Sequence, residues 1–457
     1  MEYRTEKDSM GEIRVPADKL WGAQTQRSLE NFPIGRGREL MPAEIIHAFG
    51  LVKQAAALAN RRLIPDRMPE EKLEPILKAA DEVAFGRLDA HFPLVVWQTG
   101  SGTQTNMNAN EVIARRAGEL SGLFFHPNDD INLSQSSNDT FPTALHVAAV
   151  LSLEDGVLPA VRRLIDTFLR LEEENRDVLK SGRTHLQDAV PLRFSQEIGG
   201  WRASLERDAE MISLALPGLR RLALGGTAVG TGLNAPAGFA EAAAAELSRL
   251  TGKAFSSDEN KFHALSSRDE LVFAHGALKA LAADMMKIAN DVRWLASGPR
   301  NGLGEIHIPE NEPGSSIMPG KVNPTQCEQV TMVAVQVLGN DTTIGLAASQ
   351  GNFELNVFLP VLAYDFLQSA RLLAESIGSF EARCARGIRA DRAKMAENMR
   401  RSLMTVTALS PVIGYDRAAA AAKLAYREDL SLKEACLRLD FLTEEAFDAA
   451  WQPEKMV

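Results

Sequence analysis

The feature that most constrains the fold of this chain is a series of long stretches with the periodicity of amphipathic helices, from about residue 141 to 360. Stretches such as 267–297 and 361–378 are rich in Ala and Leu, and their apolar side chains recur three and four positions apart. As helices, such stretches each carry one apolar stripe that must be buried. Polar breaks at 180–189, 225–236 and 298–323 separate the helical stretches. The sequence therefore predicts a mainly α protein built around a bundle of long helices.

Chain length and the change of pattern along the sequence together predict three domains. At 457 residues the chain is too long for one ordinary hydrophobic core. Residues 1–140 mix short segments with turns and are expected to form a mixed N-terminal domain. Residues 141–360 are expected to form the central helical bundle, and residues 361–457 a small C-terminal helical domain.

Charge and cysteine usage exclude several classes of protein. The formal net charge is −10 and the chain has no Lys/Arg run, which argues against nucleic acid as a partner. Cys327, Cys384 and Cys436 have neither disulfide-like nor metal-ligand spacing, so no disulfide framework and a reducing compartment are expected. The N-terminus, MEYRTEKDSMGEI, lacks an apolar signal core, and no uncharged apolar run approaches membrane-spanning length. We expect a cytoplasmic protein with no membrane partner.

One irregular segment concentrates the groups that can do chemistry. From Gly298 to Asn323 there are five glycines, four prolines and no helical or strand period. Within this segment, residues 314–324 read GSSIMPGKVNP and supply two hydroxyls, the cation of Lys321 and the amide of Asn323. A structureless stretch of this length inside a compact protein is usually a functional lid, although a solvated surface loop has a similar composition. The sequence predicts a mobile catalytic lid.

Four polar motifs stand just upstream of helical patterns or of a proline: Ser101–Thr105, Ser136–Thr140, Thr184–His185, and Asn323 before Pro324. A capping residue followed by proline is a helix-start signal. Helix N-termini present unpaired N–H groups and partial positive charge, so several of them together could bind a dianion in an acidic protein. Ordinary N-caps use the same residue types, but each motif has more hydroxyls or amides than one cap requires. We expect these motifs to converge on an anion site.

Six segments, in order along nearly the whole chain, resemble the signatures of the fumarase/aspartase superfamily. The lid sequence GSSIMPGKVNPTQCE is similar to that of the class II fumarate hydratase branch. The other five segments are QTGSGTQTNMNANEVIA at 98–114, HPNDDIN…SQSSND at 126–139, SGRTHLQDA at 181–189, GGTAVGTGLN at 225–234 and GNFELNVF at 351–358.

The resemblance implies a three-domain fumarase/aspartase-like fold whose central helices, from four subunits, assemble into one helical core. It also implies a reaction of the tricarboxylic acid cycle, the reversible stereospecific hydration of fumarate to L-malate through an aci-carboxylate intermediate. The resemblance further implies a homotetramer with active sites shared between subunits. No dinucleotide, P-loop or metal-ligand motif is present, so no cofactor and no metal are expected.

By the same resemblance, Ser315 is the base at carbon, His185 with Glu328 handles the water, and Lys321 stabilises the charge that develops. The expected substrate-binding residues are Ser101, Gly102, Thr103, Ser136, Ser137, Asn138, Thr184, Ser316, Lys321, Val322 and Asn323. A second, peripheral dicarboxylate site is expected at His126, Pro127, Asn128 and Asp129. His126 could equally be only a turn residue.

Two alternatives stay open at this point. Aspartate ammonia-lyases share the scaffold and the lid, but they tend to carry Gln where His185 stands. A non-catalytic structural protein on the same scaffold is disfavoured because Ser315, Lys321, Asn323 and His185 are all present. Some positions depart from the family pattern: Leu133 and Leu359 stand where many relatives have Lys, His263 where Glu is expected, and Arg268 where His is expected.

Overall fold

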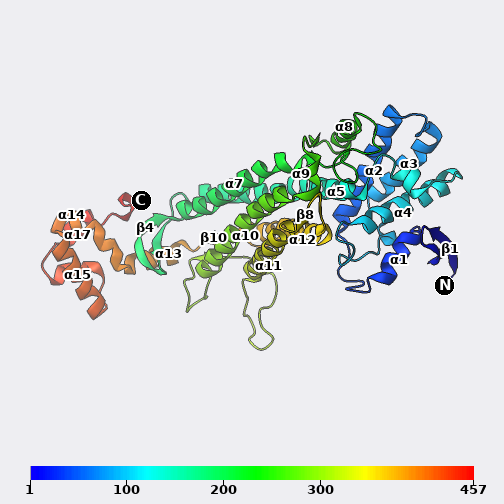
Figure 1. Ribbon diagram of the computed structural model, residues 1–457. Helices are drawn as coiled ribbons and strands as arrows, with labels where there is room; N and C mark the ends of the chain where they lie inside the picture. The colour runs from blue at the N-terminus through cyan, green and yellow to red at the C-terminus, as the bar shows by residue number, and fades with distance from the viewer. Residues whose placement is uncertain (1) are drawn as a thin grey trace. The chain divides into compact units, whose positions relative to one another are not determined.

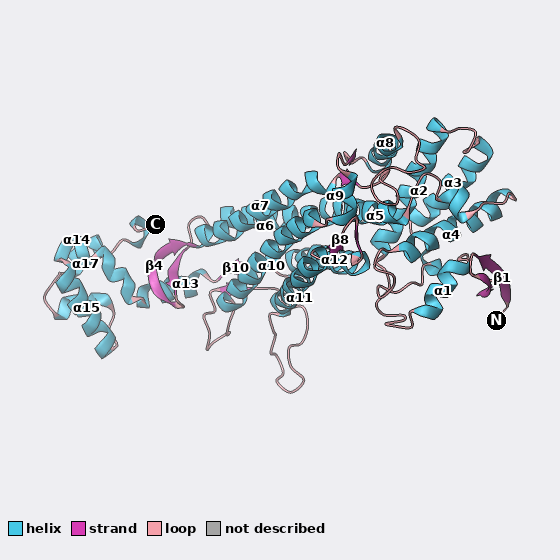
Figure 2. Ribbon diagram, in the orientation of Figure 1, coloured by secondary structure: helices cyan, strands magenta, loops and turns pink. Residues whose placement is uncertain are grey.

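The structure is a computed structural model that describes residues 2–457, and it is mainly helical (Figure 2). The predicted fold class is therefore confirmed. The chain forms two compact units, each discontinuous in sequence. The first comprises Met1–Pro159, Glu210–Ala282 and Val335–Ala374, and the second comprises Ala160–Ala209, Ala283–Ala334 and Glu375–Val457.

Most of the first unit is a group of helices, with a hairpin at the start of the chain (Figure 1). Its elements are β1 (Tyr3–Asp8), β2 (Gly11–Pro16), α1 (Ala23–Asn31), α2 (Ala43–Leu63), α3 (Glu70–Ala84), α4 (Thr103–Ser121), a π-helical turn (Pro127–Ile131), α5 (Ser137–Leu151), α8 (Phe239–Thr251) and α9 (Lys261–Ser266). Helix α2 packs against α3, α5 and α8, and most of its residues are buried. Most residues of α5 are buried as well, so this helix lies in the core of the unit.

Five long helices each contribute residues to both units. They are α6 (Leu158–Glu174), α7 (Phe194–Leu219), α10 (Asp269–Leu295), α11 (Thr325–Ala348) and α12 (Leu359–Arg383). The long helical stretches read from the sequence are thus confirmed. The boundaries of the two units differ from the predicted boundaries near residues 140 and 360, and the three-domain division remains a prediction.

A continuous helical stretch from Ser137 to Glu174 is long and apolar enough to cross a membrane by length and composition. This stretch contains charged residues, so it does not appear among the uncharged apolar runs of the sequence, none of which approaches membrane-spanning length. In the structure, 67% of its most apolar window is buried within the protein, as in the core helix of a soluble protein.

The second unit contains two small sheets and a C-terminal group of short helices. Strand β3 (Leu179–Thr184) pairs antiparallel with β4 (Gln187–Arg193), and β7 (Ile306–His307) pairs with β10 (Arg389–Ala390). The C-terminal helices are α13 (Arg392–Arg401), α14 (Ser410–Ile413), α15 (Tyr415–Glu428), α16 (Leu432–Arg438) and α17 (Glu444–Ala450). Leu409, Ala421, Cys436 and Phe447 form a small core of their own among these helices.

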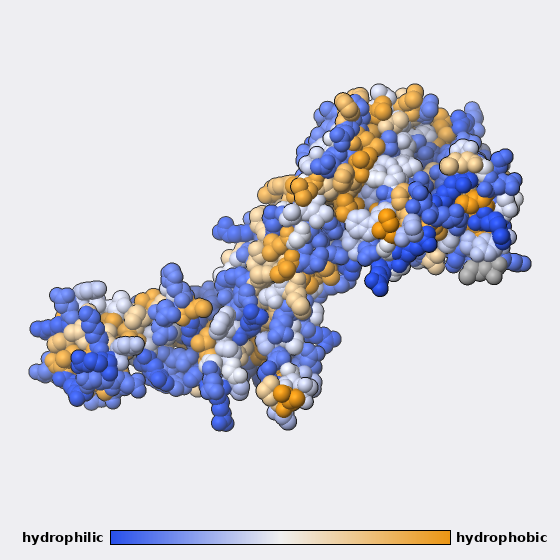
Figure 3. Space-filling view, turned by 60° about the horizontal axis from the view of Figure 1, so that its bottom comes forward, coloured by the Kyte–Doolittle hydropathy of each residue, from blue (hydrophilic) through white to orange (hydrophobic). Residues whose placement is uncertain are grey.

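Apolar side chains also remain on the surface, where they stand out among polar ones (Figure 3). In the first unit, Phe273 of α10 is 59% exposed, and Val335 and Leu346 of α11 are 62% and 64% exposed. Helices with an apolar stripe left in solvent are typical of chains that associate through that stripe. In contrast, Leu133 and Leu359, where many relatives carry lysine, are buried in this fold.

Candidate active site

Helix α4 begins inside the first polar motif, Ser101–Thr105, as predicted. Its N-cap is Gly102, in the left-handed region with a φ of 71°, and no side chain caps the helix. A Cβ at Gly102 would lie 2.0 Å from the ring of Phe141, so only glycine fits between α4 and α5. Ser101 Oγ and Thr103 Oγ1 are 2.8 Å apart at this helix start. The two hydroxyls and an uncapped N-terminus are features that suit a bound anion.

The second motif forms the start of α5, also as predicted. Ser136 is the N-cap: its Oγ accepts from Asn138 N at 3.2 Å, and its backbone N–H donates to Asp139 Oδ1 at 2.9 Å. This capping box uses Ser136 and Asp139. The side chains of Ser137 and Asn138, in the first turn of the helix, do not form this capping box and are half-buried.

Asp139 connects this helix to the glycine-rich segment 225–234. Its Oδ2 accepts from the backbone N–H groups of Gly225 and Thr227, at 2.9 Å each. Burial raises the pKa of Asp139 to about 6, against the opposing effect of these hydrogen bonds. Asn138 Nδ2 donates to the carbonyl of Ala228 at 2.8 Å, so two adjacent residues hold the same loop.

The third motif is not at a helix start, and that prediction is wrong. Thr184 ends strand β3, and His185 and Leu186 form the two-residue turn to β4. Their φ values of 58° and 60° are those of a type I′ hairpin turn, a conformation that costs non-glycine residues energy. Pro191, read as a helix-start signal, lies in β4 opposite Ser181, where a two-stranded sheet tolerates proline. Thr184 and His185 are therefore presented at an exposed hairpin tip.

The fourth polar motif, Asn323 before Pro324, lies at the C-terminal end of the predicted lid. Asn323 and Pro324 directly precede α11, as expected. Most of the segment 298–323 is an irregular loop (Figure 1), although it contains the short strand β7, which the sequence pattern did not indicate. Gly314 N donates to Lys321 O at 2.7 Å, and Asn323 Nδ2 donates to Gly314 O at 2.7 Å. A Cβ at Gly314 would lie 2.7 Å from Asn323 N, so this closure requires glycine.

Within the loop, the hydroxyl oxygen of Ser315 accepts two backbone hydrogen bonds, from Met318 N at 3.1 Å and from Ile317 N at 3.3 Å. Two N–H donors stabilise an oxygen that carries negative charge. Ser315 and Lys321 both line a hollow of about 440 Å³, and neither His185 nor Glu328 lines it. Ser316, Lys321 and Val322 are exposed on the loop, and Glu328 is exposed in the first turn of α11.

An ion pair joins the hairpin to the N-terminal part of the segment 298–323. Arg183 donates to Glu305 at 3.0 and 2.6 Å, and Lys180 Nζ lies 3.4 Å from the same carboxylate. Burial alone would raise the pKa of Glu305, but the hydrogen bond from Arg183 and the charge of Lys180 outweigh it and hold the pKa below the ordinary value. Asn398 Nδ2 donates a further hydrogen bond at 3.0 Å.

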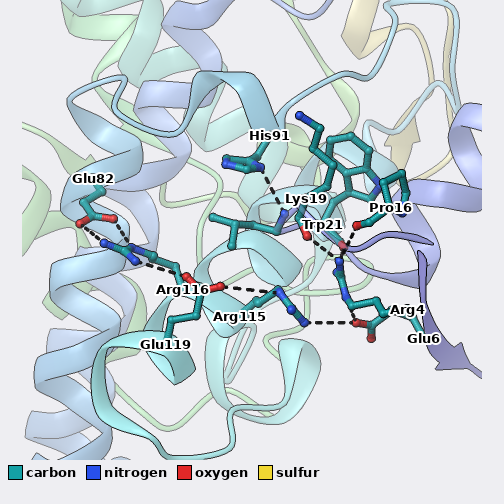
Figure 4. Close-up of polar contacts among 11 residues, drawn as sticks. Arg4, Glu6, Pro16, Lys19, Trp21, Glu82, His91, Arg115, Arg116 and Glu119 are labelled. Atoms are coloured by element: carbon teal, nitrogen blue, oxygen red, sulfur yellow. Dashed lines mark hydrogen bonds and ion pairs between the residues drawn. The ribbon is translucent and has the colours of Figure 1, made fainter. Parts of the chain in front are cut away.

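Three of the four predicted peripheral residues, His126, Pro127 and Asn128, line a cavity of about 750 Å³ in the first unit, and Asp129 does not line it. His126 Nδ1 accepts from the N–H groups of Asn128 and Asp129, at 3.2 and 3.1 Å, and so caps the turn Pro127–Ile131. Arg4, on the cavity wall, donates to the carbonyls of Pro16, Lys19 and Trp21, and both Arg4 and Arg115 face Glu6 (Figure 4). His126 therefore does act as a turn residue. The guanidinium groups of Arg4 and Arg115, on the cavity wall, are already paired within the protein.

One cluster of potential metal ligands lies outside these motifs. Ligand atoms of Asp258, His263 and Glu270 lie within 4.8 Å of one another, and all three side chains are half-buried. His263 also pairs with Asp269 at 3.2 Å, and such acidic groupings are common without a metal. None of these residues belongs to a predicted site.

The structure therefore brings together the predicted residues at the starts of α4 and α5, whereas the hollow lined by Ser315 and Lys321 includes neither His185 nor Glu328. The starts of α4 and α5 meet in the first unit, where Asn106 Nδ2 donates to Ser137 Oγ at 2.9 Å. The hairpin tip, the loop and Glu328 belong to the second unit. Sequence reasoning missed the supporting residues Asn106, Asp139 and the Arg183–Glu305 pair. Asp139 could have been found from its position three residues after Ser136, which is the spacing of a capping box.

Comparison with known proteins decides the family. A family model described as Lyase matches residues 11–339, and a second, described as Fumarase C C-terminus, matches residues 406–457. Curated proteins called fumarate hydratase class II are 62% identical in Bacillus cereus and 60% identical in Bacillus subtilis, each over 100% of this chain and 99% of the relative. This chain belongs to the class II fumarate hydratase family.

Solved structures agree with membership of the class II fumarate hydratases. A recombinant class II fumarase from Schistosoma mansoni superposes with a TM-score of 0.95 at 42% identity, covering 100% of this chain and 99% of that one. A protein described as fumarate lyase:delta crystallin from Brucella melitensis, bound to cobalt, gives a TM-score of 0.93 at 40% identity, with the same coverage. The predicted mainly α, fumarase/aspartase-like fold is confirmed by these two structures.

Proposed function

We propose that this chain is a fumarate hydratase that interconverts fumarate and L-malate in the tricarboxylic acid cycle, in the cytoplasm. The observation that carries the proposal is the match of the whole chain to class II fumarate hydratases at up to 62% identity. The polar groups at the predicted motifs suit the chemistry. Removing a proton beside a carboxylate creates an extra negative charge, so catalysis depends on donors fixed before the reaction.

Ser315 is proposed as the base that takes the proton from carbon. A serine hydroxyl is ordinarily too weak an acid for this role, and the two N–H groups directed at its Oγ supply part of the stabilisation that an alkoxide needs. Lys321, in the same hollow, is proposed to supply positive charge once the lid is closed over substrate. His185 with Glu328 is proposed to hold and activate the water.

The carboxylates of the substrate are proposed to bind at Lys321 and at the other residues of the motifs: Ser101, Gly102, Thr103, Ser136, Ser137, Asn138, Thr184, Ser316, Val322 and Asn323. Because these residues lie on segments scattered along the chain, we propose a homotetramer in which each active site takes residues from several subunits. The apolar side chains exposed on α10 and α11 support association through the long helices. The cavity beside His126 is proposed as a peripheral dicarboxylate site.

The test is to treat the purified protein with a chelator, add L-malate or L-aspartate, and follow fumarate by its ultraviolet absorbance. We expect fumarate from malate, essentially none from aspartate, and the same rate with and without chelator. Rapid turnover of aspartate would make the protein an ammonia-lyase. Activity that returns only with added iron would contradict the metal-free mechanism, and no turnover of either substrate would favour a structural protein.

A further inference from the structure

A buried ammonium group lies beside the start of α5, among residues that have not been assigned to the site. Lys53 belongs to α2, and its side chain is 1% exposed. Its Nζ donates to three side-chain oxygens: Asn106 Oδ1 at 2.7 Å, Gln135 Oε1 at 3.0 Å and Asn132 Oδ1 at 3.1 Å. An ammonium has three hydrogens and no acceptor, so its hydrogen-bonding capacity is filled.

All three partners of Lys53 are neutral amides, which makes the charge costly to bury. Burial lowers the pKa of Lys53 to about 7, and the negative charge of Asp139 opposes this effect. A buried charge without a directly bonded counter-ion reduces stability relative to an apolar side chain of the same size. Its presence therefore favours a functional reason over a purely structural one.

The ammonium fixes the orientation of Asn106. Because the protonated ammonium of Lys53 can only donate, the atom of Asn106 that faces it must be the oxygen, and Thr140 Oγ1 donates to the same oxygen at 3.0 Å. The amide nitrogen must then point the other way. It donates to Asn132 Oδ1 at 3.1 Å and to Ser137 Oγ at 2.9 Å.

This orientation decides what the Ser137 hydroxyl can do. With Asn106 Nδ2 donating to its oxygen, the single O–H of Ser137 is available to donate away from the network. If Asn106 rotated, its oxygen would face Ser137 and take that proton. Ser137 would then present lone pairs to a carboxylate, which repel it.

We propose that Lys53 is a positioning residue for the substrate: it holds Asn106 so that Ser137 stays a hydrogen-bond donor toward a substrate carboxylate. The inference rests on the proposed assignment of Ser137 as a carboxylate ligand.

The test is a double-mutant cycle on the full-length protein, read out by binding of succinate, a non-reacting four-carbon dicarboxylate, and by KM and kcat for malate. We expect Lys53→Met to weaken succinate binding and raise the KM for malate by about 10-fold or more, with a smaller effect on kcat. In a Ser137→Ala background, Lys53→Met should add less than about twofold. In a Thr103→Val background, which leaves the network intact, the full effect should remain.

A second variant keeps the test decisive where Lys53→Met does not fold. Asn106→Asp has the same size and leaves an oxygen facing Lys53, but it presents a second oxygen to Ser137. We expect it to weaken succinate binding to a similar extent while the thermal unfolding midpoint stays close to that of the unchanged protein. This effect too should disappear in the Ser137→Ala background.

Unchanged succinate affinity in Asn106→Asp overturns the inference, as do additive losses in the Lys53→Met, Ser137→Ala double variant. If Ser137→Ala alone leaves succinate affinity unchanged, the assignment of Ser137 fails and the inference falls with it. Failure of the proposed function is seen separately, as the absence of fumarate from malate in the unchanged protein.

Discussion

Arg183 and Glu305 form a doubly hydrogen-bonded ion pair, at 3.0 and 2.6 Å, that ties the hairpin carrying His185 to the segment leading to Ser315. The side chain of Glu305 is fully buried and that of Arg183 is half-buried. The pair thus couples two segments that the sequence keeps more than a hundred residues apart. Two of the proposed reacting groups, His185 and Ser315, depend on the backbone on either side of this pair.

Replacing Arg183 by Met should lower the free energy of unfolding by about 3–5 kcal/mol, because it leaves a buried carboxylate short of its main partner. It should also lower kcat. Arg193→Met is the matched control: it removes an arginine from the other strand, where the guanidinium bonds the carbonyl of Arg176. Thermal unfolding of both variants checks the prediction, and equal effects would contradict it.

The same pair predicts a pH dependence. The pKa of Glu305 is held below its ordinary value of 4.5, so the carboxylate stabilises the fold above that pH. This stabilisation is lost as the pH falls through the pKa of the folded state. The difference in Tm between the unchanged protein and Arg183→Met should therefore be full at pH 7 and shrink below about pH 4.5. A difference that grows on acidification would rule out Glu305 as its source.

Asp208 should destabilise the protein at alkaline pH. Its side chain is fully buried and, among residues 2–457, neither oxygen has a hydrogen-bond partner. Burial, with the charge of Asp284, raises its pKa to about 7 from an ordinary 3.8. The native state thus binds the proton more strongly than the unfolded state. The ionised carboxylate therefore lowers the free energy of unfolding by its full amount above pH 7, and this loss of stability is absent below pH 3.8.

Asp208→Asn should therefore raise Tm by several degrees at pH 8 and hardly change it at pH 4. Asp284→Asn serves as the control for removing a nearby acidic charge without the buried group. A lower Tm for Asp208→Asn at pH 8 would mean that a cation from another subunit pairs with this carboxylate in the assembled protein.

His185→Asn should lower kcat by about 10²-fold or more, because general acid–base groups contribute on that scale, and should remove one limb of the pH–rate profile. Asn tolerates the left-handed conformation that His185 adopts, with a φ of 58°, so the turn should remain intact. Leu186→Asn makes the same change at the other turn residue and should leave kcat near normal. Equal losses in the two variants would indicate that the turn, not the imidazole, matters.

Sharing of active sites between subunits predicts complementation. Ser315→Ala and Thr184→Val should each be inactive alone, and mixing them under conditions of subunit exchange should restore part of the activity. No recovery despite demonstrated exchange would place Ser315 and Thr184 in a site built from one chain.

The sequence was a good guide to the long helices and to three of the four polar motifs. Apolar periodicity fixes which residues a helix buries, and Ser136 and Asn323 carry local helix-start signals that need no tertiary partner. The sequence predicts a helix start at Thr184 and His185, and this is wrong because the two turn residues, His185 and Leu186, are not the Asn or Gly that normally mark a type I′ turn. The unfavourable backbone conformation, with positive φ at His185 and Leu186, is seen only in the structure.

The buried polar network could not be predicted either. Lys53 interrupts an apolar helical pattern, but its three amide partners come from segments more than fifty residues away in sequence. Glu305 and Arg183 are likewise ordinary charged residues until the fold places them together. Long-range pairs of this kind leave no local period or spacing to detect.

The proposal that Ser315 is the base at carbon is tested most directly by proton exchange at C3 of malate in deuterated solvent, followed separately from dehydration. Ser315→Ala should lower kcat by at least three orders of magnitude, about 4 kcal/mol of barrier, with succinate affinity close to normal. Exchange at C3 should vanish in Ser315→Ala and survive in part in His185→Asn. Exchange that persists in Ser315→Ala and vanishes in His185→Asn would make His185 the carbon base and contradict the mechanism.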